Sequence, residues 1–121
     1  MPRIVHDGGG GDDADARVLA TDVTVADSFL ARARGLMFRR SFPDGSALVF
    51  PFDGAAPRTL HMVCVPFDID AVWLRGGRVE RVARLSAWTG LGRAAADVVI
   101  ELPAGAADGV RAGDTVRVED G

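Results

Sequence analysis

Short apolar runs, each ended by proline or by a glycine turn, are the feature that most constrains the fold of this chain. Residues 47–50 end at Pro51, and residues 59–65 end at Pro66. Runs this short, rich in Val, Leu and Ile and bounded by turn formers, are typical of β-strands. No alternation of strands with helices accompanies them, so the sequence predicts a mainly β fold.

The same pattern recurs along the chain and predicts further strands at residues 18–25, 69–74, 78–85, 97–102 and 115–118. Arg75-Gly76-Gly77 separates two of these runs and is a strong hairpin signal. Residues 86–96 lack the pattern and predict a long loop. Together these observations predict a compact β-sandwich or jelly-roll-like barrel of about six to eight short strands.

One stretch has helical rather than strand periodicity. Asp27 can cap the N-terminus of a helix, and Gly35 suits the position just after its end. Between them, Phe29 and Ala33 recur at helical spacing. The sequence therefore predicts one short helix near residues 28–35.

The N-terminal segment has a composition that opposes folding. Residues 8–11 are glycines, and aspartates follow at positions 12, 13 and 15. Glycine raises the backbone entropy of the unfolded chain, and neighbouring carboxylates repel one another. We therefore expect residues 1–16 to form a disordered Gly/Asp-rich arm. Residues 17–119 then form a single globular β-rich domain, since 121 residues leave no room for two independent cores.

The charge composition restricts the partners of the chain. All 14 basic residues are arginine, and 17 acidic residues bring the net charge to −3. An acidic chain is a poor partner for nucleic acid, which needs a dense basic patch. The absence of lysine, together with abundant Ala, Gly, Val, Asp and Arg, is typical of a high-GC genome, and a haloarchaeal source also fits.

The sequence shows no segment that would place the chain in or across a membrane. No apolar run approaches the ~18 residues that a membrane-spanning helix needs, and residues 1–16 contain no apolar stretch that could act as a secretory signal. We therefore expect a cytoplasmic protein. The single cysteine, Cys64, excludes an intramolecular disulfide and a four-cysteine zinc site.

Three blocks of the sequence resemble, in order and approximate spacing, the motifs of one prokaryotic family. They are Arg34-Gly35-Leu36-Met37-Phe38-Arg39, then His61-Met62-Val63-Cys64-Val65 with Asp68-Ile69-Asp70, and finally Ile100-Glu101-Leu102-Pro103-Ala104-Gly105. The family is known as domain of unknown function 192. The resemblance implies a compact β-sandwich with one helix, related to jelly rolls, and it implies no established activity.

The second block departs from the family pattern. Where the family has Trp-Met-Lys-Asn-Thr, this chain has His61-Met62-Val63-Cys64-Val65, and Asp68 stands where the family usually has proline. If family members bind a ligand through the polar triplet, this chain has changed or lost that contact.

Four charged residues of the blocks are candidates for a functional site: Arg34, Arg39, Asp70 and Glu101. Each lies beside apolar residues, and a buried charge needs a partner. The planar fork of arginine is suited to hold a carboxylate. Two interpretations stay open: a pocket for a small polar or anionic ligand, and internal arginine–carboxylate pairs that pin the helix to the sheet.

The remaining candidates for ligand binding are Met37, His61, Met62 and Trp88. The methionines could line a pocket, although apolar residues at such positions usually belong to the core. Trp88 lies in the expected loop, where an aromatic ring can stack on a ligand or cover the end of the sandwich.

His61 and Cys64, with Asp68 and Asp70, form the constellation that could in principle bind a metal or activate a nucleophile. In an extended strand, however, His61 and Cys64 would point to opposite faces. Cys64, which stands between two valines, is more typical of a small buried side chain. We therefore expect no metal ligand, no cofactor and no catalytic residue here.

These observations leave three functional hypotheses. The first is a non-catalytic small-ligand-binding or accessory module, with its pocket between residues 34–39, residues 61–70 and the loop of Trp88. The second is a carboxylate-dependent hydrolase or carbohydrate-processing enzyme that uses Asp70 and Glu101, which requires both carboxyl groups to face one cleft. The third is a scaffold that binds another protein through a strand edge or an apolar patch. Whether the chain is an enzyme stays open, and a non-enzyme is favoured.

Overall fold

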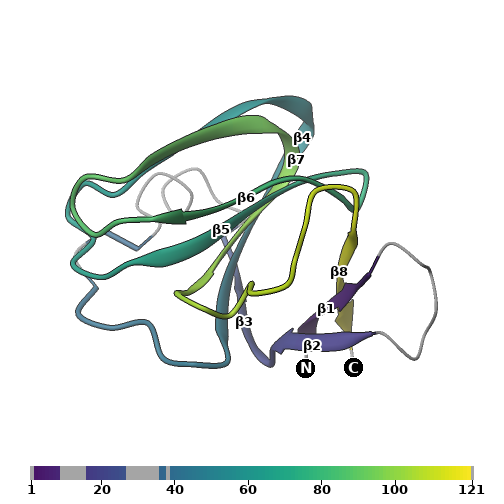
Figure 1. Ribbon diagram of the computed structural model, residues 1–121, viewed down its shortest axis with the longest axis horizontal. Coiled ribbons are helices and arrows are strands. Elements are labelled where there is room, and N and C mark those ends of the chain that lie inside the picture. The colour runs from purple at the N-terminus through teal and green to yellow at the C-terminus, as the bar shows by residue number, and fades with distance from the viewer. Residues whose placement is uncertain (1, 9–15, 27–35, 38, 121) are drawn as a thin grey trace.

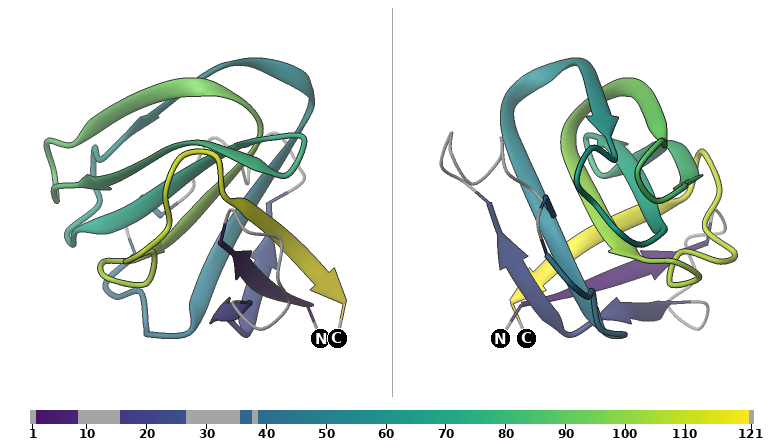
Figure 2. Two further views of the ribbon diagram at one scale, coloured as in Figure 1. Left: turned by 45° about the vertical axis from the view of Figure 1, so that its right-hand side comes forward. Right: turned by 90° about the vertical axis from the view of Figure 1, so that its left-hand side faces the viewer.

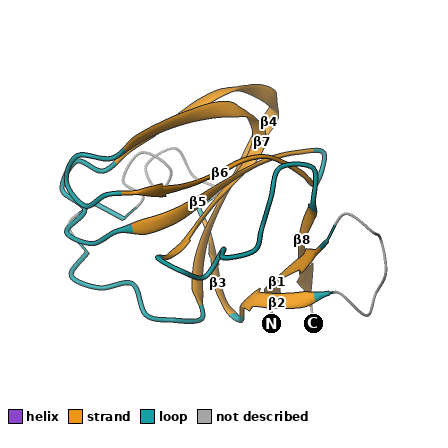
Figure 3. Cartoon of the chain, in the orientation of Figure 1, coloured by secondary structure: helices purple, strands orange, loops and turns teal. Residues whose placement is uncertain are grey.

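Eight strands make up the regular structure of the chain. The computed structural model describes residues 2–8, 16–26, 36–37 and 39–120 (Figure 1). The strands are β1 (Pro2–Asp7), β2 (Arg17–Ala20), β3 (Asp22–Val25), β4 (Ser46–His61), β5 (Ile69–Arg75), β6 (Arg78–Leu85), β7 (Leu91–Pro103) and β8 (Thr115–Asp120). The described residues contain no helix (Figure 3), and the mainly β prediction is confirmed. The predicted helix near residues 28–35 lies outside the described residues.

All eight strands belong to one curled sheet, in the order β2-β1-β8-β6-β5-β7-β4-β3. The two end strands of this order, β2 and β3, are joined in sequence by Thr21 alone, so the sheet must roll until its ends meet (Figure 2). The backbone N–H groups of Thr21 and Asp22 both donate to the carbonyl of Gly45, each at 2.9 Å, and fasten this corner. No ladder joins β2 to β3 in the described residues, so the sheet is an open roll and the barrel alternative is wrong.

The two longest strands, β4 and β7, extend well beyond the predicted boundaries. β4 continues through Pro51 to His61, with an irregular register between Pro51 and Ala56 that includes Gly54 at φ 94°. The expected end of the strand at Pro51 is therefore wrong, because proline is tolerated where the ladder is already interrupted.

The expected loop at 86–96 is also wrong beyond its first five residues, since β7 begins at Leu91. The alanines at positions 94–96 carry little strand propensity of their own. They pair with Arg58, Pro57 and Ala56 of β4. A Cβ added at Gly92 would lie 2.7 Å from Cη2 of Trp73, so glycine is needed for this ribbon to cross over the indole ring.

Alternating side chains divide the interior into two apolar cores. Ile100 and Leu102 of β7 point into the first core with Val72, Ile4 and Val116. Val99 points the other way, into a second core built around Trp73, Met62 and Leu36. Successive residues of a strand face opposite sides of the sheet, so β4, β5 and β7 serve both cores.

The N-terminal segment is not a disordered arm as far as the structure describes it. β1 pairs with both β2 and β8, and Ile4 and Val5 are buried. Two adjacent β-branched residues at positions 4 and 5 were the sequence signal for this strand, and the glycine run that follows obscured it. The folded domain therefore does not begin near Arg17, and residues 9–15 lie outside the described residues.

Candidate functional site

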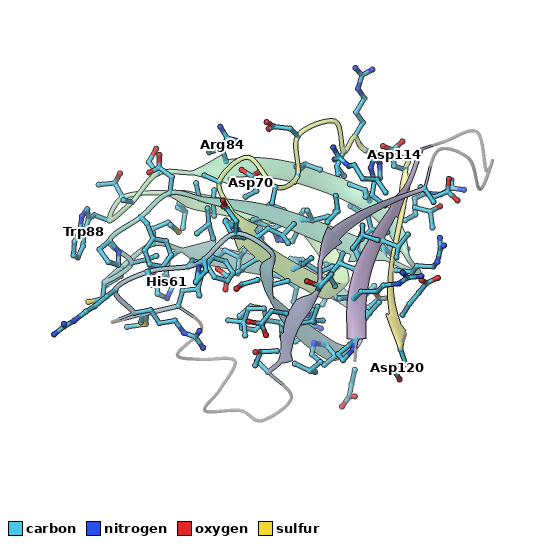
Figure 4. All side chains as sticks on the ribbon, turned by 90° about the horizontal axis from the view of Figure 1, so that it is seen from below. His61, Asp70, Arg84, Trp88, Asp114 and Asp120 are labelled. Carbon is cyan, nitrogen blue, oxygen red and sulfur yellow. The ribbon has the colours of Figure 1, made fainter. Side chains whose placement is uncertain are left out.

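Two turns meet at one end of the molecule and form what we call the two-turn tip, residues 61–65 and 86–91. His61 at the end of β4 pairs with Leu91 at the start of β7. The N–H of Met62 donates to the carbonyl of Gly90, and the N–H of Trp88 donates to the carbonyl of Val65, both at 3.0 Å. Figure 4 shows His61 and Trp88 at this same end.

The two-turn tip exposes three large apolar side chains to solvent. The exposed fractions are 53% for Val63, 60% for Trp88 and 68% for Leu91. These are the three highest values among the large apolar side chains that the structure describes. Clustered exposed apolar groups are unfavourable in water and usually mark an interaction surface.

The backbone of the two-turn tip is strained and well fixed. Cys64 at φ 60° and Trp88 at φ 67° are the two non-glycine residues with positive φ in the described chain. The left-handed conformation costs on the order of 1 kcal/mol for such residues, and strain of this kind clusters at functional sites.

Further contacts hold the strained backbone in place. The Oδ1 atom of Asp68 accepts a 2.8 Å hydrogen bond from the N–H of Ala87, and Nδ1 of His61 accepts one from the N–H of Val63 at 3.2 Å. A Cβ at Gly90 would lie 2.7 Å from the backbone nitrogen of Ser86 and 2.8 Å from Cγ of Met62. Trp88 is therefore presented on a fixed loop.

The tip also corrects the expectation for Cys64. The N–H of Val65 donates to the carbonyl of Met62 at 3.0 Å, so residues 62–65 form a turn and not the end of a strand. Cys64 is half-buried in this turn and is not a core residue. Three short backbone bonds between and within the two turns outweigh the strand propensity of the valines.

Glu101 is a second unusual feature, and it belongs to the second core. In the β-ladder it lies opposite Leu48 of β4 and Ala71 of β5, and both of these side chains are buried in that core. Burial raises the pKa of the Glu101 carboxyl to about 7, and the positive charge of Arg39 offsets this only in part. Glu101 thus keeps a proton in a pH range where most glutamates have lost it.

Asp70 has a different environment, although it also lies in the interior. Its carboxylate accepts hydrogen bonds from Nε of Arg84 at 2.8 Å and from the N–H groups of Gly105 and Ala107 at 2.9 Å each. Figure 4 shows Asp70 and Arg84 side by side. Arg84, which the sequence analysis did not single out, therefore pairs with Asp70, so the carboxylate of Asp70 is engaged within the chain. A ligand role for Asp70 stays a prediction.

The register also decides the hydrolase hypothesis. Asp70 lies opposite Leu102, which points into the first core, and the next pair, Ala71 with Glu101, faces the second core. The two carboxyl groups are therefore on opposite faces of the sheet and cannot flank one substrate bond. A paired-carboxylate mechanism through these residues is ruled out.

The predicted site residues thus separate into groups. Met62 is buried in the second core and Met37 packs against it, while Glu101 borders the same core beside Leu48 and Ala71 and is influenced by the charge of Arg39. His61 and Trp88 share the two-turn tip, in which Met62 is the buried residue. Arg34 lies outside the described residues.

One buried polar pair was missed by the sequence analysis. Nε2 of His6 lies 2.8 Å from Oδ2 of Asp114, and His6 is buried. Asp114 also accepts a hydrogen bond from the N–H of Arg111. The sequence signal for this pair is a histidine next to two β-branched residues, within the segment expected to form the disordered arm. The pair joins β1 to the turn before β8, so we assign it a structural role.

A family model described as uncharacterized ACR, DUF192, matches residues 12–118 of the chain. The chain belongs to the DUF192 family. This family is uncharacterised, so membership brings no activity with it. Among curated proteins, the chain is similar to the UPF0127 protein TK1120 of Thermococcus kodakarensis, with 38% identity over 56 residues. That match covers 46% of this chain and only 36% of the relative.

Two solved structures share the fold of this DUF192 member. One, from Sinorhizobium meliloti 1021 and provisionally described as a transcription regulator, has a TM-score of 0.80 and 22% identity, covering 97% of this chain and 92% of that one. The other, a protein of unknown function from Novosphingobium aromaticivorans DSM 12444, has a TM-score of 0.76 and 22% identity, covering 95% and 83%. At this identity the likeness concerns the fold alone. In the described part of this chain, no helix is long and apolar enough to cross a membrane.

Proposed function

We propose that this protein is a non-catalytic accessory module that binds another protein through the two-turn tip. The observation that carries the proposal is Trp88, an indole 60% exposed on a loop held at φ 67°. The proposal joins the first and third hypotheses from the sequence, because it makes the module a binder whose contact is an exposed apolar patch.

The energetics of the tip support a role in binding. Exposed Val63, Trp88 and Leu91 gain little from the hydrophobic effect within the chain, and the positive φ at Trp88 adds a cost. A fold selected for stability alone would bury or replace these side chains. Rigid aromatic anchors surrounded by smaller apolar groups are typical of the energetic centre of a protein–protein interface.

The interior carboxylates support the non-catalytic part of the proposal. Asp70 is used by Arg84 and by two backbone N–H groups, which leaves it engaged as an acceptor. Glu101 lies on the other face of the sheet from Asp70. The carboxylate chemistry expected from the sequence therefore has no common cleft in which to operate.

The remaining features of the proposal rest on composition. A net charge of −3 supports a partner other than nucleic acid. As part of the same proposal, the module acts in the cytoplasm.

Site-specific photo-crosslinking in the source organism tests the proposal. A photoreactive phenylalanine analogue replaces Trp88 in one strain and Val118 in another, since Val118 is an exposed apolar residue of β8 outside the tip. We expect a discrete protein adduct from position 88 that is absent from position 118 and is weakened by Leu91→Ser. The same adducts from both positions, or none from position 88, would contradict the proposal.

A further inference from the structure

We propose that the partner of the two-turn tip carries an acidic segment, which binds along a row of arginines that begins beside the tip. This row, which we call the basic stripe, consists of Arg93 on β7, Arg81 and Arg78 on β6, and Arg75 at the end of β5. All of these side chains are exposed. The inference rests on the proposed function, because it names the chemistry of the partner that the tip binds.

The register of the β5–β6 hairpin places three of these arginines on one face. Trp73 lies opposite Arg81, and Arg75 lies opposite Arg78. Leu74 points into the first core, so Trp73 and Arg75 on either side of it point the other way. The Cζ atom of Arg81 lies 5.4 Å from the centre of the Trp73 ring, which agrees with this placement. Arg75, Arg78 and Arg81 therefore share one face of the hairpin.

Arg93 connects this face to the two-turn tip. Nη1 of Arg81 donates a 2.9 Å hydrogen bond to the carbonyl of Arg93. A Cβ at Gly92 would point at Trp73, so the side chains of its neighbours Leu91 and Arg93 point the opposite way, to the outside. Leu91 belongs to the tip. The basic stripe thus begins two residues from the exposed apolar patch, on the same face of β7.

The charges of the basic stripe are not neutralised within the described chain. None of its arginines forms an ion pair with a carboxylate of the described residues. Asp97, which lies near the hairpin, accepts a 3.0 Å hydrogen bond from the N–H of Gly76 instead. Arg75 and Arg78 face each other directly across the ladder, and like charges in that position destabilise a sheet. An anionic partner would remove this repulsion.

The arrangement suits carboxylates on an extended, partly apolar segment. Guanidinium groups bind carboxylates through two parallel hydrogen bonds, and the adjoining tip offers Trp88 and Leu91 to apolar side chains. An extended peptide rises ~3.3 Å per residue, so about ten residues are enough to contact both the tip and the stripe. A nucleic acid suits the surface less, because the chain has a net charge of −3 and such binding needs a denser basic patch.

Fluorescence anisotropy of labelled peptides with the full chain tests the inference at neutral pH. The probe is a peptide of about ten residues in which Glu alternates with Leu, and its control has Gln in place of Glu. We expect the acidic peptide to bind about tenfold more tightly than the Gln peptide. Raising NaCl from about 50 mM to about 300 mM should weaken the acidic peptide about fivefold, because salt screens exposed charges.

Charge reversals locate the binding surface. Arg93→Glu and Arg78→Glu should each weaken the acidic peptide about tenfold, because each replaces an attraction with a repulsion. Arg111→Glu is the matched control, since it makes the same change of charge at an exposed position of the loop before β8, and it should change the affinity by less than about twofold. The salt comparison uses the unmodified chain, so it stands even if a variant fails to fold.

Several outcomes would overturn the basic stripe. They are no binding of the acidic peptide up to about 1 mM, equal binding of the two peptides, or an equal loss of affinity in Arg93→Glu and Arg111→Glu. Tighter binding of an oligothymidylate of similar length would overturn the acidic segment in favour of nucleic acid.

Trp88→Ala separates failure of the stripe from failure of the tip. Both peptides carry leucine, so this variant should weaken both of them. Equal binding of the two peptides that is lost in Trp88→Ala but kept in Arg93→Glu would overturn the stripe and leave the tip in place. A loss in Arg93→Glu without any loss in Trp88→Ala would support the stripe and count against the tip.

Discussion

Two loops of this protein are held to the sheet by aspartates only two residues apart, and they use that support in opposite ways. Asp70 accepts hydrogen bonds from the N–H groups of Gly105 and Ala107 and so fixes the loop before β8. Asp68 accepts a hydrogen bond from the N–H of Ala87 and so fixes the loop of Trp88. The first loop turns Ala107 and Val110 into a core, whereas the second turns its tryptophan to solvent.

The difference teaches what each fixed loop is for. When a loop buries apolar side chains, the hydrophobic stabilisation offsets the entropy that the loop loses on ordering. The loop of Trp88 is ordered and strained but exposes its tryptophan, so no hydrophobic burial within the chain offsets the cost of ordering it. A complex that covers the indole would supply this hydrophobic stabilisation. For this reason we assign the two-turn tip to binding.

The largest effect is expected from breaking the first loop's support. Asp70→Ala removes a carboxylate that accepts from Arg84 and from two backbone N–H groups, and it should lower the free energy of unfolding by about 4 kcal/mol. Urea denaturation at neutral pH measures the change. Asp108→Ala, which removes only the exposed second partner of Arg84, should cost about 0.5 kcal/mol or less. A similar cost for both variants would show that the loop is not held by Asp70.

The next effect concerns Glu101, the carboxyl that lacks such support. Its pKa is about 7 in the folded chain and near 4.5 when unfolded, so the folded state binds more protons between these values. Stability from this group is fully present below pH ~4.5 and is lost as the pH rises through ~7.

The measurement compares Glu101→Gln with the parent chain across this pH range. The difference in free energy of unfolding should grow from near zero at pH ~4.5 to about 3 kcal/mol above pH ~8, in favour of the variant. Glu80→Gln is the matched control and should follow the parent at every pH. A Glu101→Gln difference that does not vary with pH would show that Glu101 is not a proton-holding group.

A smaller effect is expected from crowding the second loop. Gly90→Ala places a Cβ within 2.7 Å of the backbone nitrogen of Ser86, so either the turn shifts or Met62 moves. The loss should be about 2 kcal/mol. Thr89→Ala, at the exposed neighbouring position, should change stability by about 0.5 kcal/mol or less. Thermal unfolding compares the two, and equal midpoints would mean that the loop of Trp88 is not tightly fixed.

The smallest effect on stability is expected from Trp88 itself. Trp88→Ala should change the free energy of unfolding by about 0.5 kcal/mol or less, because the indole is mostly in solvent. Val110→Ala, which truncates a much smaller but buried side chain of the first loop, should cost about 1–2 kcal/mol. If Trp88→Ala proves the more damaging variant, the indole is part of the core and the contrast between the loops fails.

Much of the fold could be predicted from the local sequence, and the errors of that prediction have physical causes. The β5–β6 hairpin follows from Arg75-Gly76-Gly77, because both glycines take positive φ. The extent of β4 and β7 could not be predicted, since Pro51 lies beside a ladder irregularity and the alanines of β7 form a strand only because β4 pairs with them. Tertiary pairing decided these boundaries, and the sequence pattern does not contain it.

Only part of the candidate site could be predicted, because strand pairing also decides the environment of its residues. Trp88 and Glu101 could be singled out from the sequence, but the face toward which Glu101 points depends on the register with Ala71. The pairing of Asp70 with Arg84 depends on the register between β5 and β6. A shift of β5 by one residue would turn Asp70 to the face of the sheet that Glu101 occupies.

The two tryptophans allow the central claim to be tested directly. With 5-fluorotryptophan in place of tryptophan, the protein should give two ¹⁹F resonances, one from buried Trp73 and one from exposed Trp88. On addition of soluble extract from the source organism, we predict that the Trp88 resonance broadens or shifts while that of Trp73 keeps its position, and that excess unlabelled protein, but not unlabelled Trp88→Ala, reverses the change. An unchanged Trp88 resonance, or one restored equally well by Trp88→Ala, would contradict the assignment of the two-turn tip to partner binding.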